Sequence, residues 1–196
     1  MNTNLFNASD ETAALVRLHT RLERSAEQLG LLDVAYRTVD TPVGVLLLAT
    51  TDVGLVRVAY DIQNHDAVLD ALARTVSPRI LRAPARLDAA ARQLDDYFAK
   101  RRKHFELPLD LRLATGFRRM VLDHLRRIGY GQRETYAAVA RAVGKPRAVR
   151  AVGTACARNP LPIVIGCHRV VRSDGSAGLY AGGAQAKSAL LSLEAG

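Results

Sequence analysis

The chain has 196 residues, of which 48% are hydrophobic and 24% charged, a composition ordinary for a globular protein with a substantial core. It has neither an apolar run long enough to cross a bilayer nor a signal peptide at its N-terminus, so we expect a cytoplasmic protein without a membrane partner. The two cysteines, Cys156 and Cys167, would both stay as thiols in such a reducing compartment.

The net charge of +9 is concentrated in one half of the chain. Residues 1–110 carry 14 Lys and Arg against 15 Asp and Glu, a balance of −1, whereas residues 111–196 carry 14 against 4, a balance of +10. Charge runs are often plain solvated surface, but a basic half beside a neutral half indicates contact with a polyanion. Because the chain has no Trp, and its basic residues are not interleaved with aromatic ones, duplex DNA is a better candidate than a single strand.

Residues 1–31 form a predicted extension that contains one helix. Its apolar residues recur at the three- and four-residue spacing of a single helix face: Leu15, Leu18, Leu22, Ala26 and Leu29. We expect this stripe to dock on the body of the protein. The alternative is a contact with a partner or with a second copy of the chain.

The next predicted unit, residues 32–110, is a small α/β domain. Runs of apolar and β-branched residues, separated by turn residues, predict strands over 34–39, 45–50 and 55–60. Two segments with helical periodicity follow, over 66–76 and 85–99.

The third predicted unit, residues 111–196, is a DNA-binding domain. The pattern predicts helices over 116–128, 135–143 and 147–157. The short turn between the last two suits a helix-turn-helix of the winged-helix kind. The last of these helices would place Arg147, Arg150 and Arg158 near one another, and its small residues, Ala151, Gly153 and Thr154, would permit a close approach to DNA. The expected fold class is therefore α/β (α+β), with a strand-rich domain followed by a helical one.

Cys167 stands in a context that suggests chemistry. The apolar run Pro162 to Ile165 predicts a buried strand that leads directly into Gly166, Cys167, His168 and Arg169. A Gly-rich loop over 173–183 and a final helix over 185–194 complete the chain. A thiolate is a nucleophile, and cationic neighbours such as His and Arg lower the pKa of a thiol.

The other candidate chemistries fit less well. Cys156 lies within a predicted helix and fits a structural cysteine. The five histidines are scattered, without the clustered spacing of a zinc site, so we expect neither a metal nor a cofactor.

The segment from Asn159 to Val171 resembles the active-site segment of the O6-alkylguanine-DNA alkyltransferases, also called methylated-DNA–protein-cysteine methyltransferases. Their signature is Pro-Cys-His-Arg-Val, preceded by Asn-Pro and an apolar strand. The similarity extends to 150–153, to 178–183, and to Lys187 and Glu194. One departure lies inside the signature, where Gly166 replaces the proline before the cysteine.

The resemblance implies a single-turnover transferase and a role for each matching residue. Cys167 would take a methyl or other alkyl group irreversibly from O6-alkylguanine, and by extension from O4-alkylthymine, in duplex DNA. His168 would act as base through a bound water, with Glu194 orienting it. Tyr136 would help the guanine to leave, and Asn159 would brace the active-site turn.

The resemblance also implies how damaged DNA would be bound. Arg150 would fill the gap left when the alkylated guanine is flipped out of the stack, since a base inside the duplex cannot reach a buried thiol. Residues near O6 of the guanine would be Tyr180, Lys187 and Gly182. We expect the protein to act as a monomer.

Two other classes of protein remain to be weighed. An alkyltransferase-like protein binds and flips the lesion without accepting the alkyl group, but such proteins lack the cysteine that is present here as Cys167. A helix-turn-helix regulator with an incidental cysteine would explain the charge, but not the set of Asn159, His168, Tyr180 and Glu194.

Overall fold

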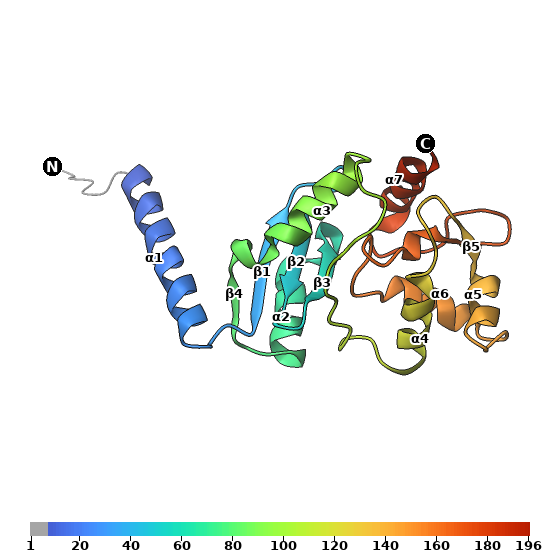
Figure 1. The fold of residues 1–196 in the computed structure, drawn as a ribbon, viewed down its shortest axis with the longest axis horizontal. Helices are drawn as coiled ribbons and strands as arrows, with labels where there is room; N and C mark the ends of the chain where they lie inside the picture. Colours follow the sequence, from blue (N-terminus) through green and yellow to red (C-terminus); the bar gives the residue numbers. More distant parts are fainter. Residues whose placement is uncertain (1–7) are drawn as a thin grey trace.

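A computed structural model describes residues 8–196 of the chain. The fold is a mixed α/β one, in which a strand-rich domain is followed by a helical domain, and the first helix, α1 (Ala8–Gln28), projects from the strand-rich domain (Figure 1). Within residues 8–196, no helix is long and apolar enough to cross a membrane.

The first domain is built on a four-stranded sheet of order β3-β2-β1-β4. The strands β1, β2 and β3 form an antiparallel meander, and β4 pairs parallel to β1. The fourth strand was not predicted, because its three residues are too few to show an alternating pattern. The elements of this domain are β1 (Val34–Val39), β2 (Leu46–Thr50), β3 (Leu55–Tyr60), α2 (His65–Thr75), β4 (Ile80–Arg82) and α3 (Asp88–Phe98), with short 3-10 turns at Asp61–Gln63 and Pro84–Leu87.

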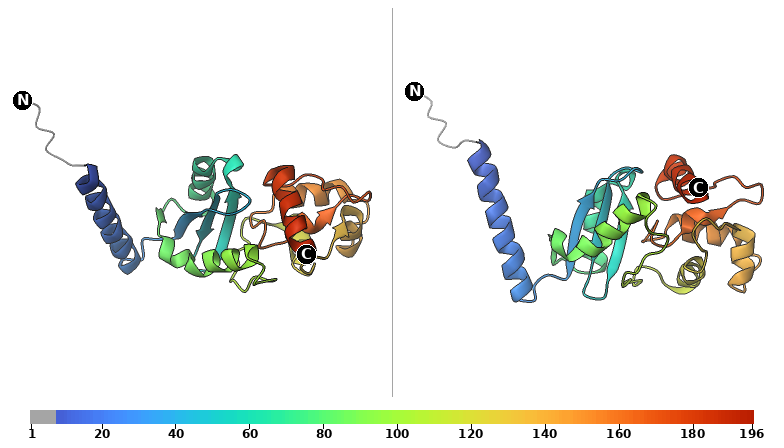
Figure 2. Two further views of the ribbon diagram at one scale, coloured as in Figure 1. Left: turned by 90° about the horizontal axis from the view of Figure 1, so that it is seen from above. Right: turned by 45° about the horizontal axis from the view of Figure 1, so that its top comes forward.

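Helices α2 and α3 cover opposite faces of this sheet (Figure 2). Alternate residues of β2 point to opposite faces, so Leu46 and Leu48 share a core with Leu94 of α3, whereas Leu47 packs in the cluster that contains Leu72 of α2. This central strand is buried along its whole length, which explains its nearly continuous apolar sequence.

The helical domain holds the C-terminal elements around one core. Its helices α5 and α6 form the predicted helix-turn-helix pair. The elements are α4 (Gly116–Leu125), β5 (Glu134–Thr135), α5 (Tyr136–Ala142), α6 (Val149–Ala157), a 3-10 turn at Cys167–Arg169, β6 (Val170–Val171) and α7 (Gly183–Ala195), with β5 parallel to β6.

The apolar run before Cys167 is not the predicted strand. Ile163 adopts a left-handed φ of 72°, and the N–H of Ile165 donates to the carbonyl of Leu161 over 2.8 Å, so the segment is a tight turn. All three of these side chains are fully buried. An apolar run predicts burial, but it does not distinguish a buried strand from a buried turn.

The two domains meet along β3 and the segment that follows α3. The N–H of Leu55 donates to the carbonyl of Pro108, and the N–H of Val58 donates to the carbonyl of Pro160, both over 2.8 Å. Gly54 permits this approach, since a Cβ atom there would lie 2.3 Å from the carbonyl oxygen of Pro108. An edge of the sheet therefore supports the turn that precedes Cys167.

The expectation that the stripe on α1 docks on the body is wrong. Leu15, Leu18 and Leu22 are 61%, 62% and 53% exposed. The helix projects from the end of the molecule opposite the helical domain (Figures 1 and 2).

Candidate active site

Cys167 lies at the first position of the 3-10 turn and is fully buried. Asn159 holds it in place: its Nδ2 donates to Sγ of Cys167 over 3.1 Å and to the carbonyl of Ile165 over 3.0 Å. The Oδ1 atom of Asn159 also accepts from the N–H of Leu161 over 2.9 Å. One side chain thus ties the whole turn together and donates to the sulfur.

The environment of the thiol differs from the sequence-based expectation. Burial raises the pKa of the Cys167 thiol to about 11, although the hydrogen bond from Asn159 and the positive charge of Lys187 act in the opposite direction. The expectation that neighbouring cations lower the pKa of this thiol is therefore wrong in its net sign, because desolvation outweighs them. At neutral pH the sulfur carries its proton, and a base is needed to make it nucleophilic.

His168 and Glu194 supply a candidate for that base. His168 is fully buried, and its Nε2 lies 2.9 Å from Oε1 of Glu194, which comes from α7. Burial lowers the pKa of the His168 ring, which is therefore neutral at neutral pH. The second ring nitrogen, Nδ1, is buried and has no hydrogen-bond partner among the described residues.

Glu194 is the centre of a larger polar network. Burial acts to raise the pKa of its carboxyl, but the hydrogen bonds from His168 and Arg169 outweigh burial and hold that pKa well below its usual range. An ionised Glu194 accepts a hydrogen bond from the N–H at Nε2 of His168, which leaves Nδ1 as the lone-pair nitrogen. The hydroxyl of Tyr97 on α3 donates to Oε1 over 2.7 Å, and the N–H of Gly131 donates to Oε2 over 3.1 Å.

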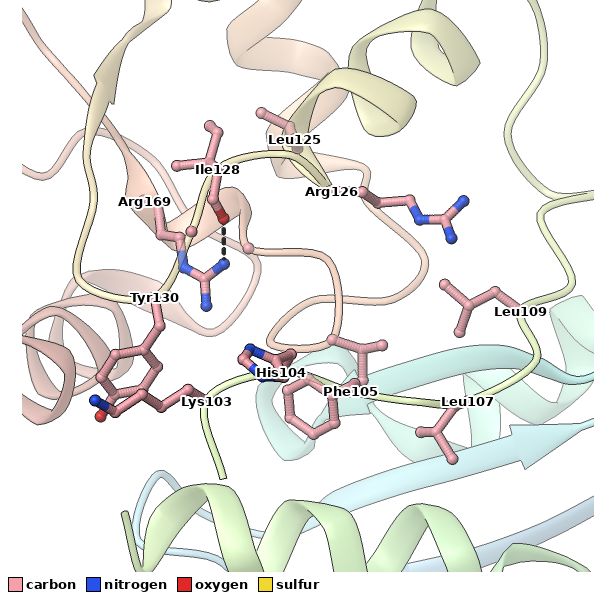
Figure 3. Close-up of a pocket in the computed structure, with 13 residues that line it drawn as sticks. Lys103, His104, Phe105, Leu107, Leu109, Leu125, Arg126, Ile128, Tyr130 and Arg169 are labelled. Carbon is pink, nitrogen blue, oxygen red and sulfur yellow. Dashed lines mark hydrogen bonds between the residues drawn. The ribbon is translucent and has the colours of Figure 1, made fainter. Parts of the chain in front are cut away.

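Arg169 links this network to the loop after α4. Its Nε lies 3.0 Å from Oε2 of Glu194 and its Nη2 lies 2.9 Å from Oε1, while Nη1 donates to the carbonyl of Ile128 over 2.6 Å. Figure 3 shows that last bond beside a pocket of about 250 Å³ behind the active-site turn. Both Arg169 and Gly166 line this pocket.

Gly166 has a backbone that proline could adopt but a crowded neighbourhood. Its φ is −67°, within the range that a proline ring imposes. A Cβ atom there, however, would lie 2.8 Å from Cδ of Arg169. The glycine therefore leaves room for the observed position of Arg169, which packs against the backbone on its way to Glu194.

Lys187 and Tyr136 lie on the other side of Cys167. Lys187 is fully buried, and its Nζ donates to the carbonyl of Val170 over 2.6 Å and to the hydroxyl of Tyr136 over 3.4 Å. Burial lowers the pKa of the Lys187 ammonium group and raises the pKa of Tyr136 to about 12. The hydroxyl of Tyr136 also reaches the carbonyl of Leu179 over 3.5 Å.

The Gly-rich loop folds back over the site. The hydroxyl of Tyr180 lies 3.0 Å from that of Tyr60 at the end of β3, and the Tyr180 ring is packed edge-on at 6.3 Å from the ring of His168. Gly182 lies against the Tyr60 ring, which a Cβ atom at that position would approach to 2.6 Å.

The residues expected to bind DNA form a separate, exposed set. Arg150, Ala151 and Thr154 lie on the exposed side of α6, opposite the buried Val152. Arg147 is exposed too, but it lies in the turn before α6 rather than on the helix, which begins at Val149 and not at 147.

The two sets of residues meet at Gly153. A Cβ atom there would contact Cε1 of Tyr136 at 4.0 Å, so α6 and the Tyr136 side chain are direct neighbours. The exposed face of α6 is thereby adjacent to the buried site.

Sequence reasoning missed Tyr60 and Tyr97, and it treated Arg169 as a cationic neighbour of Cys167 rather than as a partner of Glu194. Tyr97 lies 97 positions before Glu194, and nothing local marks it as part of a polar network. Arg169 carried a usable signal, because a buried arginine beside apolar residues requires a partner of opposite charge.

The comparisons with known proteins cover both domains. The profile described as "6-O-methylguanine DNA methyltransferase, ribonuclease-like domain" matches residues 34–111, and the DNA binding domain of the same description matches residues 116–196. The methylated-DNA–protein-cysteine methyltransferase of Mycolicibacterium paratuberculosis is 38% identical over 161 residues, which cover 82% of this chain and 92% of that protein. The constitutive enzyme of Bacillus subtilis is 39% identical over 160 residues, which cover 81% of this chain and 94% of that protein.

Solved structures give the same result. The O6-methylguanine methyltransferase of Mycobacterium tuberculosis is 36% identical with a TM-score of 0.70, over 83% of this chain and 93% of that one. The structure of Mycobacterium tuberculosis OGT in complex with DNA is 35% identical with a TM-score of 0.71, over 82% of this chain and 92% of that one. The chain therefore belongs to the family of methylated-DNA–protein-cysteine methyltransferases, the DNA-repair enzymes that transfer an alkyl group from damaged DNA to one of their own cysteines.

Proposed function

We propose that Cys167 is the alkyl acceptor of this enzyme and that O6-alkylguanine in duplex DNA is the donor. The observation that carries the proposal is the buried Cys167 thiol, braced by Asn159 and followed directly by His168, whose Nδ1 has no hydrogen-bond partner within residues 8–196. In a single displacement the sulfur–carbon bond forms as the bond from that carbon to O6 breaks. The alkyl group cannot leave the thioether that is formed, so each chain reacts once.

The proton of the thiol needs an acceptor, because the pKa of Cys167 lies near 11. We assign this role to Nδ1 of His168, acting through a bound water. Glu194 accepts from Nε2, and this contact would stabilise the positive ring that forms when Nδ1 takes the proton. Asn159 would hold the sulfur in position during the attack.

The departing guanine carries negative charge and must take up a proton. Tyr136 would assist at this stage, and Lys187 beside it supplies a positive charge near the site. Tyr180 and Gly182, on the loop that covers the site, would line the pocket near O6.

DNA would be bound by α6 and the turn before it. The exposed residues Arg147, Arg150, Ala151 and Thr154, with Gly153 behind them, would lie along the minor groove, and Arg150 would fill the gap left by the flipped nucleotide. The balance of +10 over residues 111–196 supports contact with phosphates. Because Cys167 has no exposed surface, the side chains that cover its sulfur must move before a flipped base can reach it.

We assign a different role to each of three consecutive segments of the chain. Residues 1–31 are an extension, residues 32–110 a supporting α/β domain, and residues 111–196 the DNA-binding and acceptor domain. One chain carries the complete site, so the catalytic unit is a monomer. We place its action in the cytoplasm, where Cys156 and Cys167, both free here, would remain reduced.

A duplex that contains one O6-methylguanine tests the proposal. After incubation, peptide mass mapping should find one methyl group per chain, on Cys167 and not on the buried Cys156 of α6, without any added cofactor. Cys167→Ala should abolish transfer, and Cys156→Ala should preserve it. A methyl group on Cys156, more than one turnover per chain, or a need for S-adenosylmethionine would each refute the mechanism. Binding without any transfer would favour the alkyltransferase-like alternative, which the presence of Cys167 disfavours.

A further inference from the structure

The apolar face of α1 is uncovered. Leu15, Leu18 and Leu22 lie along one side of this helix and are 53–62% exposed, and Leu29, just beyond the end of the helix, is 70% exposed. The helix has 21 residues and is about 31 Å long, and the stripe from Leu15 to Leu22 extends over about 10 Å of that length. Apolar faces of this size on a soluble helix are usually buried against another surface.

A polar contact beside the stripe links the helix to the body: Nε2 of His19 lies 2.7 Å from the carbonyl oxygen of Arg82. The same ring nitrogen lies 2.9 Å from Oε1 of Glu23, one turn further along α1. Between the helix and the body lies an open groove of about 630 Å³, lined by Leu15, Leu18 and Leu22 on one wall and by Arg82 and Pro84 on the other. The groove is therefore bounded on both sides but has no occupant among residues 8–196.

The charges at the margins of the stripe favour a second copy of the same helix. Glu11 lies in line with the leucines near one end, and Arg21 flanks them near the other; within residues 8–196 neither has an ion-pair partner. If two helices pack antiparallel with Leu15 of one against Leu18 of the other, Glu11 of each lies beside Leu22 of the other, within reach of its Arg21. A parallel pair would instead set like charges against each other.

We propose that α1 is a dimerisation helix that packs antiparallel against α1 of a second copy. The leucine stripes and the two grooves are then buried together, and the two Glu11–Arg21 pairs set the direction. The protein would then be a dimer in solution rather than the expected monomer. Each chain of the dimer would still carry a complete catalytic site. Helix α1 and the helical domain lie at opposite ends of the molecule (Figure 1), so the dimer leaves both Cys167 sites and both α6 helices free.

Sedimentation equilibrium of the full chain, over a range of concentrations and without DNA, tests the proposal. The natural protein should show a reversible monomer–dimer equilibrium. The double variant Leu18→Gln/Leu22→Gln should raise the dissociation constant at least about tenfold, since glutamine keeps helix propensity but removes the apolar surface. Val53→Gln is the matched control: Val53 is 52% exposed, as Leu22 is 53% exposed, but it lies on the body, in the turn before β3. Circular dichroism should show equal helix content in all of these proteins.

A charge exchange tests the direction of packing. Glu11→Arg and Arg21→Glu should each weaken the dimer, and the variant with both changes should restore it. A natural protein that is monomeric at every concentration would overturn the proposal. So would a Val53→Gln variant whose dimer dissociation constant rises as much as that of Leu18→Gln/Leu22→Gln. A stronger dimer in Glu11→Arg alone would overturn the antiparallel arrangement. None of these outcomes depends on methyl transfer, so they are independent of the proposed function.

Discussion

The sheet domain and the helical domain contribute to the site in different ways. The helical domain provides the sulfur, the candidate base and its carboxylate, and it carries the whole excess of positive charge. The sheet domain provides two hydroxyl groups, those of Tyr97 and Tyr60, which reach the site only through Glu194 and Tyr180. We therefore expect the groups of the helical domain to determine whether the reaction occurs, and the two hydroxyl groups of the sheet domain to determine how rigidly those groups are held.

The largest expected effect is that of Glu194→Gln, at the centre of the helical domain's network. The change leaves Arg169 buried without its counter-charge, which should cost about 3–5 kcal/mol of stability. It also removes the negative charge that would stabilise the His168 ring once Nδ1 takes up the proton of the thiol, so methyl transfer should nearly stop. Thermal unfolding and single-turnover transfer measure the two effects.

Glu134→Gln is the matched control for this variant. Glu134 lies in the same domain and also contacts a histidine, with 2.9 Å between its Oε2 and Nε2 of His124, but the pair is partly exposed. Loss of this pair should lower the free energy of unfolding by no more than about 1 kcal/mol and leave methyl transfer intact. Similar effects of the two variants would contradict the central place given to Glu194.

Tyr97→Phe tests the contribution of the sheet domain. Loss of a hydrogen bond to a charged group should cost about 1.5–3 kcal/mol of stability, and transfer should slow without stopping, because His168 and Arg169 still hold Glu194. Tyr130→Phe removes a hydroxyl that donates only to the carbonyl of Leu193, so it should cost less, about 0.5–1.5 kcal/mol. A complete loss of transfer in Tyr97→Phe would remove the distinction between the two domains.

Gly166→Pro tests the one departure from the family signature. The φ of −67° suits proline, but its Cβ atom would lie 2.8 Å from Cδ of Arg169, so the Arg169 side chain must shift from its observed position. We expect a net loss of about 1–3 kcal/mol and slower transfer. Gly166→Ala adds the same Cβ atom without the ring, and it should show much of the loss. If proline proves stabilising and the variant reacts faster, the glycine has no role in accommodating Arg169.

The smallest effect concerns DNA rather than the buried chemistry. Arg150→Ala should slow repair of duplex DNA about tenfold, equivalent to about 1.4 kcal/mol, because nothing then fills the gap in the stack. Reaction with free O6-benzylguanine, which needs no flipping, should be unchanged. Arg158→Ala, at the C-terminal end of α6, is the control and should affect both substrates little. Equal losses on both substrates would show that Arg150 acts on the chemistry instead.

Local sequence patterns predicted most of the elements correctly. The strands over 34–39 and 55–60 and the helix-turn-helix over α5 and α6 are confirmed, because alternation, helical periodicity and turn residues are properties of neighbouring positions. The candidate nucleophile was also evident from the residues around it.

Only the tertiary structure decided what surrounds those residues. The thiol pKa of Cys167 rises rather than falls because burial, which neighbours in sequence do not reveal, outweighs the nearby charges. The run 161–165 is a turn because it fits the core in that form, and Tyr97 reaches Glu194 only because two domains pack together. The stripe on α1 was visible in the sequence as an apolar face, but the pattern alone did not show that the body leaves it uncovered.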